Sequence, residues 1–100
     1  MIYITQLIYI LDGKEQVFDL FENVAIPAIA RYNGRLELRI RPAADSVIYA
    51  DAECPYEVHL VSFPSQQDFD RFKNDEERKR FLHLKEESVR SVLMIQGVAI

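Results

Sequence analysis

The stretch RLELRIR, residues 35–41, alternates strictly between charged and apolar side chains. Leu36, Leu38 and Ile40 point to one side of the chain, and the other side carries only charged residues, namely Arg35, Glu37, Arg39 and Arg41. A period of two is typical of a β-strand with one apolar and one polar face. The stretch therefore predicts a strand over 35–41, and it raises the question of what the charged face contacts.

The residues before this strand change to helical spacing. Apolar side chains in residues 15–32 fall on one half of a helical wheel, and Glu22 lies with other polar residues on the opposite half. Pro27 removes a backbone donor, so it should kink the helix or separate its last turn. Asn33 and Gly34 form the expected left-handed stop. The pattern predicts an amphipathic helix over 15–32.

Strand patterns and capping signals predict the remaining elements. Residues 2–11 are nearly all apolar, as in a strand buried on both faces. A strand is expected at 56–63, and a last strand at about 90–99. Between them, a helix should start at the N-cap Ser65, break near Asn74 and restart from Asp75 to about Ser88. The irregular stretch 42–54 includes a candidate short strand at 47–50. The element order predicts an α+β, ferredoxin-like fold: a four-stranded antiparallel sheet with two helices on one face.

Composition limits the class of protein. The 100 residues are expected to form a single domain, residues 1–100. A net charge of −4 argues against a nucleic-acid partner. Acidic residues flank the basic run 78–80, which we interpret as a solvated helix face. Cys54 is the only cysteine, so neither an internal disulfide nor a cysteine-based zinc site is expected.

The sequence shows no motif for targeting or for cofactor binding. The apolar start at 2–11 is too short to span a bilayer and lacks the features of a signal peptide, so we expect a cytoplasmic protein with no membrane partner. No glycine-rich phosphate loop follows the first strand. With only His59 and His83 in the chain, we expect neither a metal-ligand cluster nor a Ser-His-Asp triad. We therefore predict no cofactor and no metal, and we interpret His83 as a surface residue.

The predicted sheet has more apolar surface than one helix layer can cover. Both sides of residues 2–11 are apolar, and so are both sides of the last strand. Each large apolar side chain contributes roughly 1.5–3 kcal/mol when it is buried. A homodimer in which the uncovered sheet faces pack against each other would bury these side chains.

Two segments resemble a known family. FENVAIPAIARYNGRLELR, residues 21–39, is similar to the helix, proline and glycine turn of the dimeric α+β barrel proteins, in particular the family catalogued as domain of unknown function 1330. VSFPSQQDFDRFKNDEERKRFLHLKEESVR, residues 61–90, resembles the later half of that family. Many members have two glycines where this chain has Asn33 and Gly34. The superfamily includes cofactor-independent monooxygenases, muconolactone-isomerase-like enzymes and proteins of no known activity. The resemblance therefore implies a dimer with a cavity between the sheets and fixes no reaction.

The strand phase suggests a candidate site. If the apolar residues of 35–41 face the helices, its arginines face the partner subunit. The candidate ligand-binding residues on that face are Arg39, Arg41 and Glu57, with His59 as the candidate catalytic base. A guanidinium there would bind a carboxylate or enolate, and His59 would transfer a proton near neutral pH. Gln6, in the middle of the most apolar strand, is a further candidate cavity residue, or else a hydrogen-bonding residue across the dimer.

Three functions are compatible with these patterns. The leading hypothesis is a homodimer that binds a small apolar or anionic ligand between its sheets. The second is a cofactor-independent monooxygenase or isomerase with His59 as its base. The third is a structural or interaction dimer with no pocket, in which the charged residues form a cross-strand ion-pair ladder.

Overall fold

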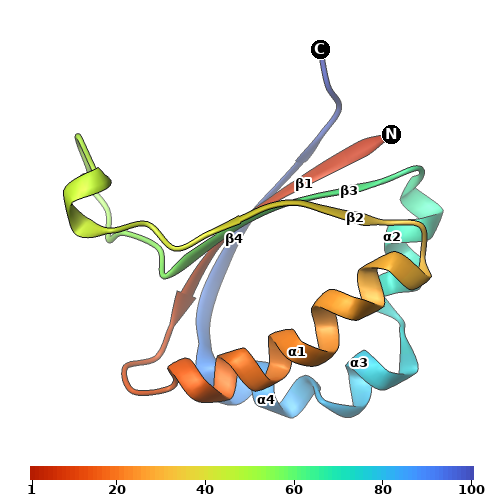
Figure 1. Cartoon of the computed structure of the whole chain (residues 1–100), viewed down its shortest axis with the longest axis horizontal. Coiled ribbons are helices and arrows are strands. Elements are labelled where there is room, and N and C mark those ends of the chain that lie inside the picture. The colour runs from red at the N-terminus through yellow and green to blue at the C-terminus, as the bar shows by residue number, and fades with distance from the viewer.

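The computed structural model describes residues 1–100 and contains a four-stranded antiparallel sheet with helices on one face only (Figure 1). Its spatial strand order is β2-β3-β1-β4, where the strands are β1 (Ile2–Ile10), β2 (Arg35–Ile40), β3 (Glu57–Phe63) and β4 (Val89–Gly97). The helices are α1 (Glu15–Arg31), α2 (Gln66–Lys73), α3 (Glu76–Arg80) and α4 (Leu82–Ser88). The predicted ferredoxin-like α+β fold is confirmed.

Helix α1 connects β1 to β2 and remains continuous through Pro27. Of the two effects predicted for Pro27, a kink or a separated last turn, the separation does not occur. Ala28 and Ile29 follow Pro27 and are buried, and this packing holds the last turn in place despite the missing backbone donor. Asn33 follows the helix with a φ of 64°, which confirms the predicted left-handed stop.

The connection from β3 to β4 consists of three helices. Ser65 is the N-cap of α2, as predicted, and its hydroxyl accepts a hydrogen bond from the Asp68 N–H at 3.1 Å. Asp75 caps α3 in the same way, accepting from the Arg78 N–H at 2.8 Å. A further break at Phe81, which the sequence pattern did not predict, separates α3 from α4. No helix of the chain combines the length and the apolar character needed to cross a membrane.

The connection from β2 to β3 does not contain the candidate strand at 47–50. The connection contains a single turn of 3-10 helix, Ala44–Ser46. The prediction of a short strand at 47–50 is therefore wrong. The connection projects away from the sheet, so no neighbouring strand is available for pairing (Figure 1).

Strand β2 has one more residue than its partner over the paired region. Leu36 and Leu38 pair with consecutive residues of β3, so Glu37 between them has no opposite residue in the β2–β3 pairing. Such an extra residue breaks the alternation of the strand. Side chains that follow it point to the face opposite to the one that strict alternation would give them. Leu36 therefore faces the helices, whereas Leu38 and Ile40 face the uncovered side and are 48% and 45% exposed. The expectation that all three face the helices is wrong for Leu38 and Ile40.

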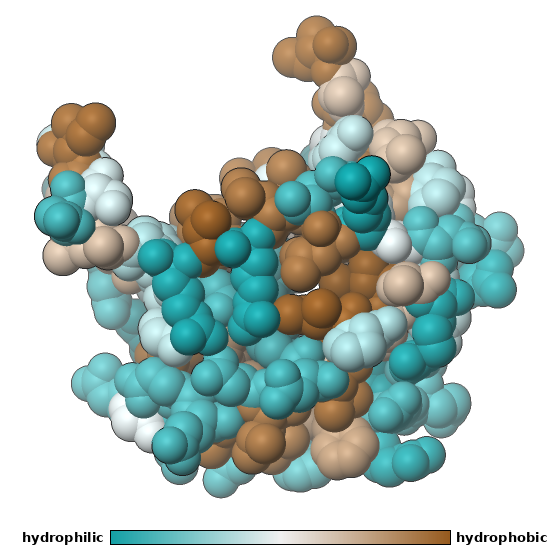
Figure 2. Space-filling model, viewed as in Figure 1, coloured by the Kyte–Doolittle hydropathy of each residue, from teal (hydrophilic) through white to brown (hydrophobic).

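The uncovered face of the sheet is largely apolar. Besides Leu38 and Ile40, it carries Leu93 and Ile95 of β4, which are 55% and 57% exposed. The β2–β3 connection and the C-terminus also project on this side, away from the helix layer (Figure 1), and end in exposed apolar side chains (Figure 2). The uncovered face of a single chain thus leaves a large apolar surface in contact with water.

Candidate functional site

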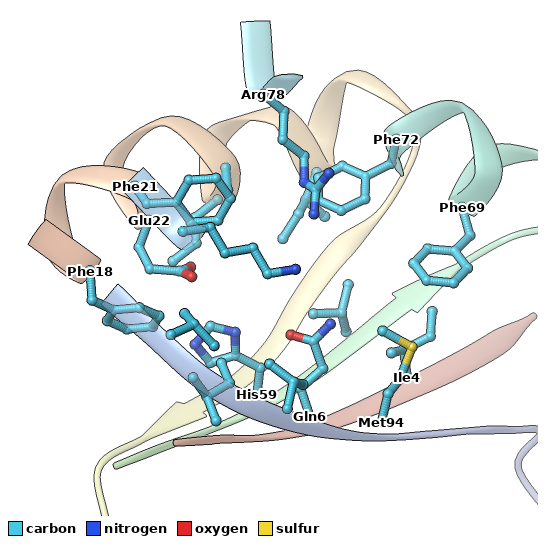
Figure 3. Close-up of a pocket in the computed structure, with 18 of the residues that line it drawn as sticks. Ile4, Gln6, Phe18, Phe21, Glu22, His59, Phe69, Phe72, Arg78 and Met94 are labelled. Carbon is cyan, nitrogen blue, oxygen red and sulfur yellow. The ribbon is translucent and has the colours of Figure 1, made fainter. Parts of the chain in front are cut away.

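A cavity of about 160 Å³ lies between the sheet and the helix layer of the single chain. Most of its lining is apolar, and aromatic side chains surround it, namely Phe18 and Phe21 of α1 and Phe69 and Phe72 of α2 (Figure 3). The polar or charged side chains in the lining are Gln6, Glu22, His59, Arg78 and Lys85. The cavity predicted from the sequence lay between two sheets, whereas this one lies on the opposite side of the sheet.

The alternation of β3 places two candidate residues on this side. Glu57 and His59 are buried together with Val61 and Phe63, because every second residue of the strand faces the helices. Gln6 lies directly opposite His59 in the β1–β3 pairing, and its side chain points into the cavity (Figure 3). The expectation that Glu57 and His59 lie on the uncovered face is therefore wrong.

Glu57 is fully buried and connects His59 to Arg39 of β2 and to Arg41, which follows that strand. Its carboxylate accepts hydrogen bonds from Arg39 Nε at 3.0 Å and from Arg41 Nε at 2.8 Å, and it also contacts His59 Nε2. Arg41 makes a second ion pair with Asp19 of α1 at 2.7 Å. The extra residue in β2 explains this arrangement, because it turns Arg39 and Arg41 toward the helix-covered side. The predicted grouping of these four residues occurs, but on the covered side of the sheet.

The environment of Glu57 keeps its carboxyl ionised. Burial raises the pKa of Glu57, but hydrogen bonds from His59, Arg39 and Arg41 outweigh this effect and lower the pKa to about 2. An ionised carboxylate can only accept hydrogen bonds. His59 Nε2 must therefore carry the hydrogen and donate a hydrogen bond to Glu57, which leaves Nδ1 as the ring nitrogen with a free lone pair.

Glu22 of α1 is a second buried carboxyl near His59. Its side chain points toward the cavity and the imidazole ring (Figure 3), and it makes no ion pair within 4.0 Å. Burial raises the pKa of Glu22, an effect that His59 and the positive charge of Arg39 partly oppose and to which the Glu57 carboxylate adds. Glu22 was assigned to the polar half of its helix from the sequence, so its place in the cavity was not predicted.

Glu22, Glu57 and His59 could each offer one ligand atom to a metal ion, because these atoms lie within 4.8 Å of one another. The chemistry of this donor set does not favour a cation. Both Glu57 oxygens already accept hydrogen bonds from arginines, which a metal ion would have to displace. The basic residues nearby would also repel a divalent ion.

Two basic residues of the cavity come from the helix layer. Arg78 of α3 and Lys85 of α4 are both partly buried and line the cavity. The interpretation of the run 78–80 as a solvated face is therefore wrong for Arg78, because α3 turns that side chain inward (Figure 3). Lys85 was not among the residues singled out from the sequence. Neither residue shows a pattern that distinguishes it from neighbouring surface cations.

Solved structures resemble this chain, although no protein-family model matches it and no curated protein matches its sequence. An uncharacterized NIPSNAP domain protein from Burkholderia xenovorans gives a TM-score of 0.72 at 12% identity, covering 100% of this chain and 95% of that chain. A putative antibiotic biosynthesis monooxygenase from Nitrosomonas europaea gives 0.76 at 10% identity, covering 100% and 99%. A dimeric protein of unknown function and ferredoxin-like fold from Bacteroides fragilis gives 0.69 at 13% identity, covering 96% and 93%.

Identities this low show the fold alone. The more specific resemblance to domain of unknown function 1330 stays a prediction. The chain has the ferredoxin-like α+β fold that is also found in a NIPSNAP domain protein and in a putative antibiotic biosynthesis monooxygenase.

Proposed function

We propose that this protein binds a small, largely apolar organic molecule in the cavity between its sheet and its helix layer. The observation that carries the proposal is the cavity itself, about 160 Å³ in volume and lined mainly by aromatic and aliphatic side chains around the oriented ring of His59. Cavities of about 150 Å³ hold a molecule the size of benzene. The expected ligand is therefore of single-ring size. The cytoplasmic location expected from the sequence remains a prediction.

A second candidate function is proton transfer on the bound molecule without a cofactor. The arrangement of Glu57 and His59 favours it, because a carboxylate that holds one imidazole nitrogen leaves the other free to act as a base. An isomerase would return the abstracted proton to a different atom. A monooxygenase would allow the resulting carbanion to react with dioxygen, and a structural neighbour is described as a putative antibiotic biosynthesis monooxygenase.

Native mass spectrometry with a panel of single-ring aromatic and alicyclic compounds tests ligand binding. Ala25 is buried in the cavity wall, so Ala25→Leu should fill the cavity and abolish binding. Ala30 is exposed on the same helix, and Ala30→Leu is the matched control that should bind as the wild type does. Equal binding by both variants would place the ligand outside the cavity and contradict the proposal.

The His59→Ala variant distinguishes a binding protein from an enzyme. If the protein is an enzyme, this variant should retain the ligand and lose at least about 100-fold in turnover, because general bases commonly contribute that much. His83 is exposed on α4, so His83→Ala serves as the control with unchanged turnover. Unchanged turnover in His59→Ala would exclude His59 as the base.

We also propose that two copies of the chain pack through their uncovered sheet faces. The exposed apolar side chains of β2 and β4 on this face support it, because a second copy offers the same apolar surface. The structural neighbour from Bacteroides fragilis is described as dimeric. Because the cavity lies on the other side of the sheet, ligand binding and dimer formation use different surfaces of the chain.

A further inference from the structure

Arg78 places an incompletely paired guanidinium at the cavity. Its Nε is buried and has no hydrogen-bonding partner, and one terminal nitrogen donates only to the Lys73 carbonyl at 3.2 Å. The guanidinium lies over the rings of Phe21 and Phe72, with centroid distances of 5.8 and 5.3 Å. Buried N–H donors almost always have an acceptor, so an unpaired one beside a cavity indicates that an acceptor binds there.

The position of Arg78 is fixed by the contacts of Asp75. The Asp75 carboxylate accepts hydrogen bonds from the Arg78 N–H at 2.8 Å and from Tyr32 Oη at 2.6 Å, and it pairs with Arg31 at 3.0 Å. These bonds attach the start of α3 to the end of α1. The carboxylate therefore satisfies the backbone of Arg78 while leaving its side chain free to extend over the aromatic rings.

Lys85 adds a second cation to the same cavity and makes no ion pair within 4.0 Å. Burial lowers the pKa of Lys85, and repulsion from Arg78 lowers it further, whereas Glu22 acts in the opposite direction. Burial also lowers the pKa of Arg78. By contrast, Arg39 and Arg41 are already paired with Glu57. The cavity thus has two cations on its helix side that lack a carboxylate at ion-pair distance.

We propose that Arg78 and Lys85 bind the carboxylate of a small aromatic acid whose ring occupies the apolar part of the cavity. This inference rests on the proposed ligand-binding function and names the class of ligand. A carboxylate has two acceptor oxygens for the two cations, and its charge relieves their repulsion. The ring would contact the aromatic side chains of α1 and α2, and the carboxylate would lie beside Arg78, across the cavity from His59 (Figure 3).

Isothermal titration calorimetry of residues 1–100 with benzoate and with benzamide tests this assignment. Benzamide has nearly the same shape as benzoate but no charge. Benzoate should bind the wild type at least about ten-fold more tightly than benzamide, as expected for charge-assisted hydrogen bonds. This comparison needs no variant, so it does not depend on the folding of a mutant protein.

Two variants test the named residues. Arg78→Gln and Lys85→Gln should each weaken benzoate binding about ten-fold or more and leave benzamide binding unchanged. Lys79→Gln and Arg80→Gln change exposed cations next to Arg78 and should bind both compounds as the wild type does. Far-ultraviolet circular dichroism of each variant establishes that it is folded.

The outcomes separate this inference from the proposed function. If benzoate and benzamide bind the wild type equally, or if benzoate binding survives both substitutions, recognition of a carboxylate is overturned and cavity binding still stands. If neither compound binds the wild type and the wider panel of single-ring compounds also fails, the proposed function and this inference fall together.

Discussion

At the scale of single residues, two buried glutamates on the helix-covered side of the sheet have pKa values shifted in opposite directions, because only one of them has hydrogen-bonding partners that outweigh the effect of burial. Glu57 has three hydrogen-bonding partners and a pKa of about 2. Its contribution to stability is fully present above the ordinary value of 4.5 and is lost as the pH falls toward 2. Glu22 has no ion-pair partner, and burial raises its pKa. The contribution of Glu22 to stability is fully present below pH 4.5, where the carboxyl is protonated. It is lost as the pH rises through the raised pKa of the folded state.

Replacing each glutamate by glutamine should therefore give opposite results. At pH 7, Glu57→Gln should lower the free energy of unfolding by about 3 kcal/mol, because it removes the buried carboxylate that holds His59 and two partly exposed arginines and whose pKa is lowered from 4.5 to about 2. Glu22→Gln should raise it by about 1 kcal/mol, because it removes the cost of an unpaired buried charge. Urea denaturation at pH 7 and pH 3 measures both effects. At pH 3 the Glu57→Gln effect should shrink and the Glu22→Gln effect should vanish; effects of the same sign at pH 7 would contradict this account.

The sequence contained a signal for one of the unpredicted cavity residues. Glu22 is spaced four residues from Phe18, three from Ala25 and seven from Ile29, all of which are buried on the inner face of α1. This helical spacing places Glu22 on the inner face of α1, although charged side chains are usually exposed. Arg78 offered no such signal. It differs from Lys79 only in the direction that α3 gives it, and that direction depends on the tertiary contacts of Asp75.

At the scale of elements, the order and type of the main helices and strands followed from periodicity, whereas the phase of β2 did not. Residues 35–41 alternate perfectly in the sequence, so nothing in them indicates that Glu37 is unpaired. Only the pairing with β3 shows which residue the ladder omits. For this reason the sequence grouped Arg39, Arg41, Glu57 and His59 correctly but placed them on the uncovered face.

The turn between α1 and β2 allows a test at this scale. A Cβ atom on Gly34 would lie 2.7 Å from Ile29 Cγ2 and 2.8 Å from Phe63 Cδ1, both in the packed core. Gly34→Ala should therefore lower the free energy of unfolding by about 1–3 kcal/mol, a typical cost of overpacking. Gly97 has no atom within 4 Å of such a Cβ, so Gly97→Ala is the matched control with little effect. Thermal unfolding compares the two variants. Equal stability would contradict the prediction and show that neighbouring side chains move to accommodate the added methyl group.

At the scale of the whole molecule, the sheet separates two functions that would otherwise compete for one surface. The proposed ligand lies between the sheet and the helices, and the proposed partner subunit lies against the other face. Tyr3, Leu7 and other large side chains of β1 belong to that second face, which explains why this strand is apolar on both sides. The two-sided apolar pattern predicted a second contact surface but did not reveal where the cavity lies.

A charge on the uncovered face should prevent dimer formation. Leu93 is 55% exposed there, and Leu93→Glu would place a carboxylate where the proposed partner packs. Leu20 is also 55% exposed but lies on α1, so Leu20→Glu is a control with matched exposure. Sedimentation velocity at micromolar concentration should find dimers for the wild type and Leu20→Glu and monomers of about 12 kDa for Leu93→Glu. Monomers in all three samples would exclude the dimer.

The unpaired Glu37 has a consequence for comparing this chain with distant relatives. In a homologue of equal length whose strand is regular at this point, the positions aligned with Arg39 and Arg41 would point toward the uncovered face, and those aligned with Leu38 and Ile40 would point toward the helices. At identities near 10%, a sequence alignment does not reveal such a shift. Equivalent positions in β2 should therefore be assigned from superposed backbones, because the pairing of this strand with β3, with or without an extra residue, decides which side chains support the imidazole and which lie on the uncovered face.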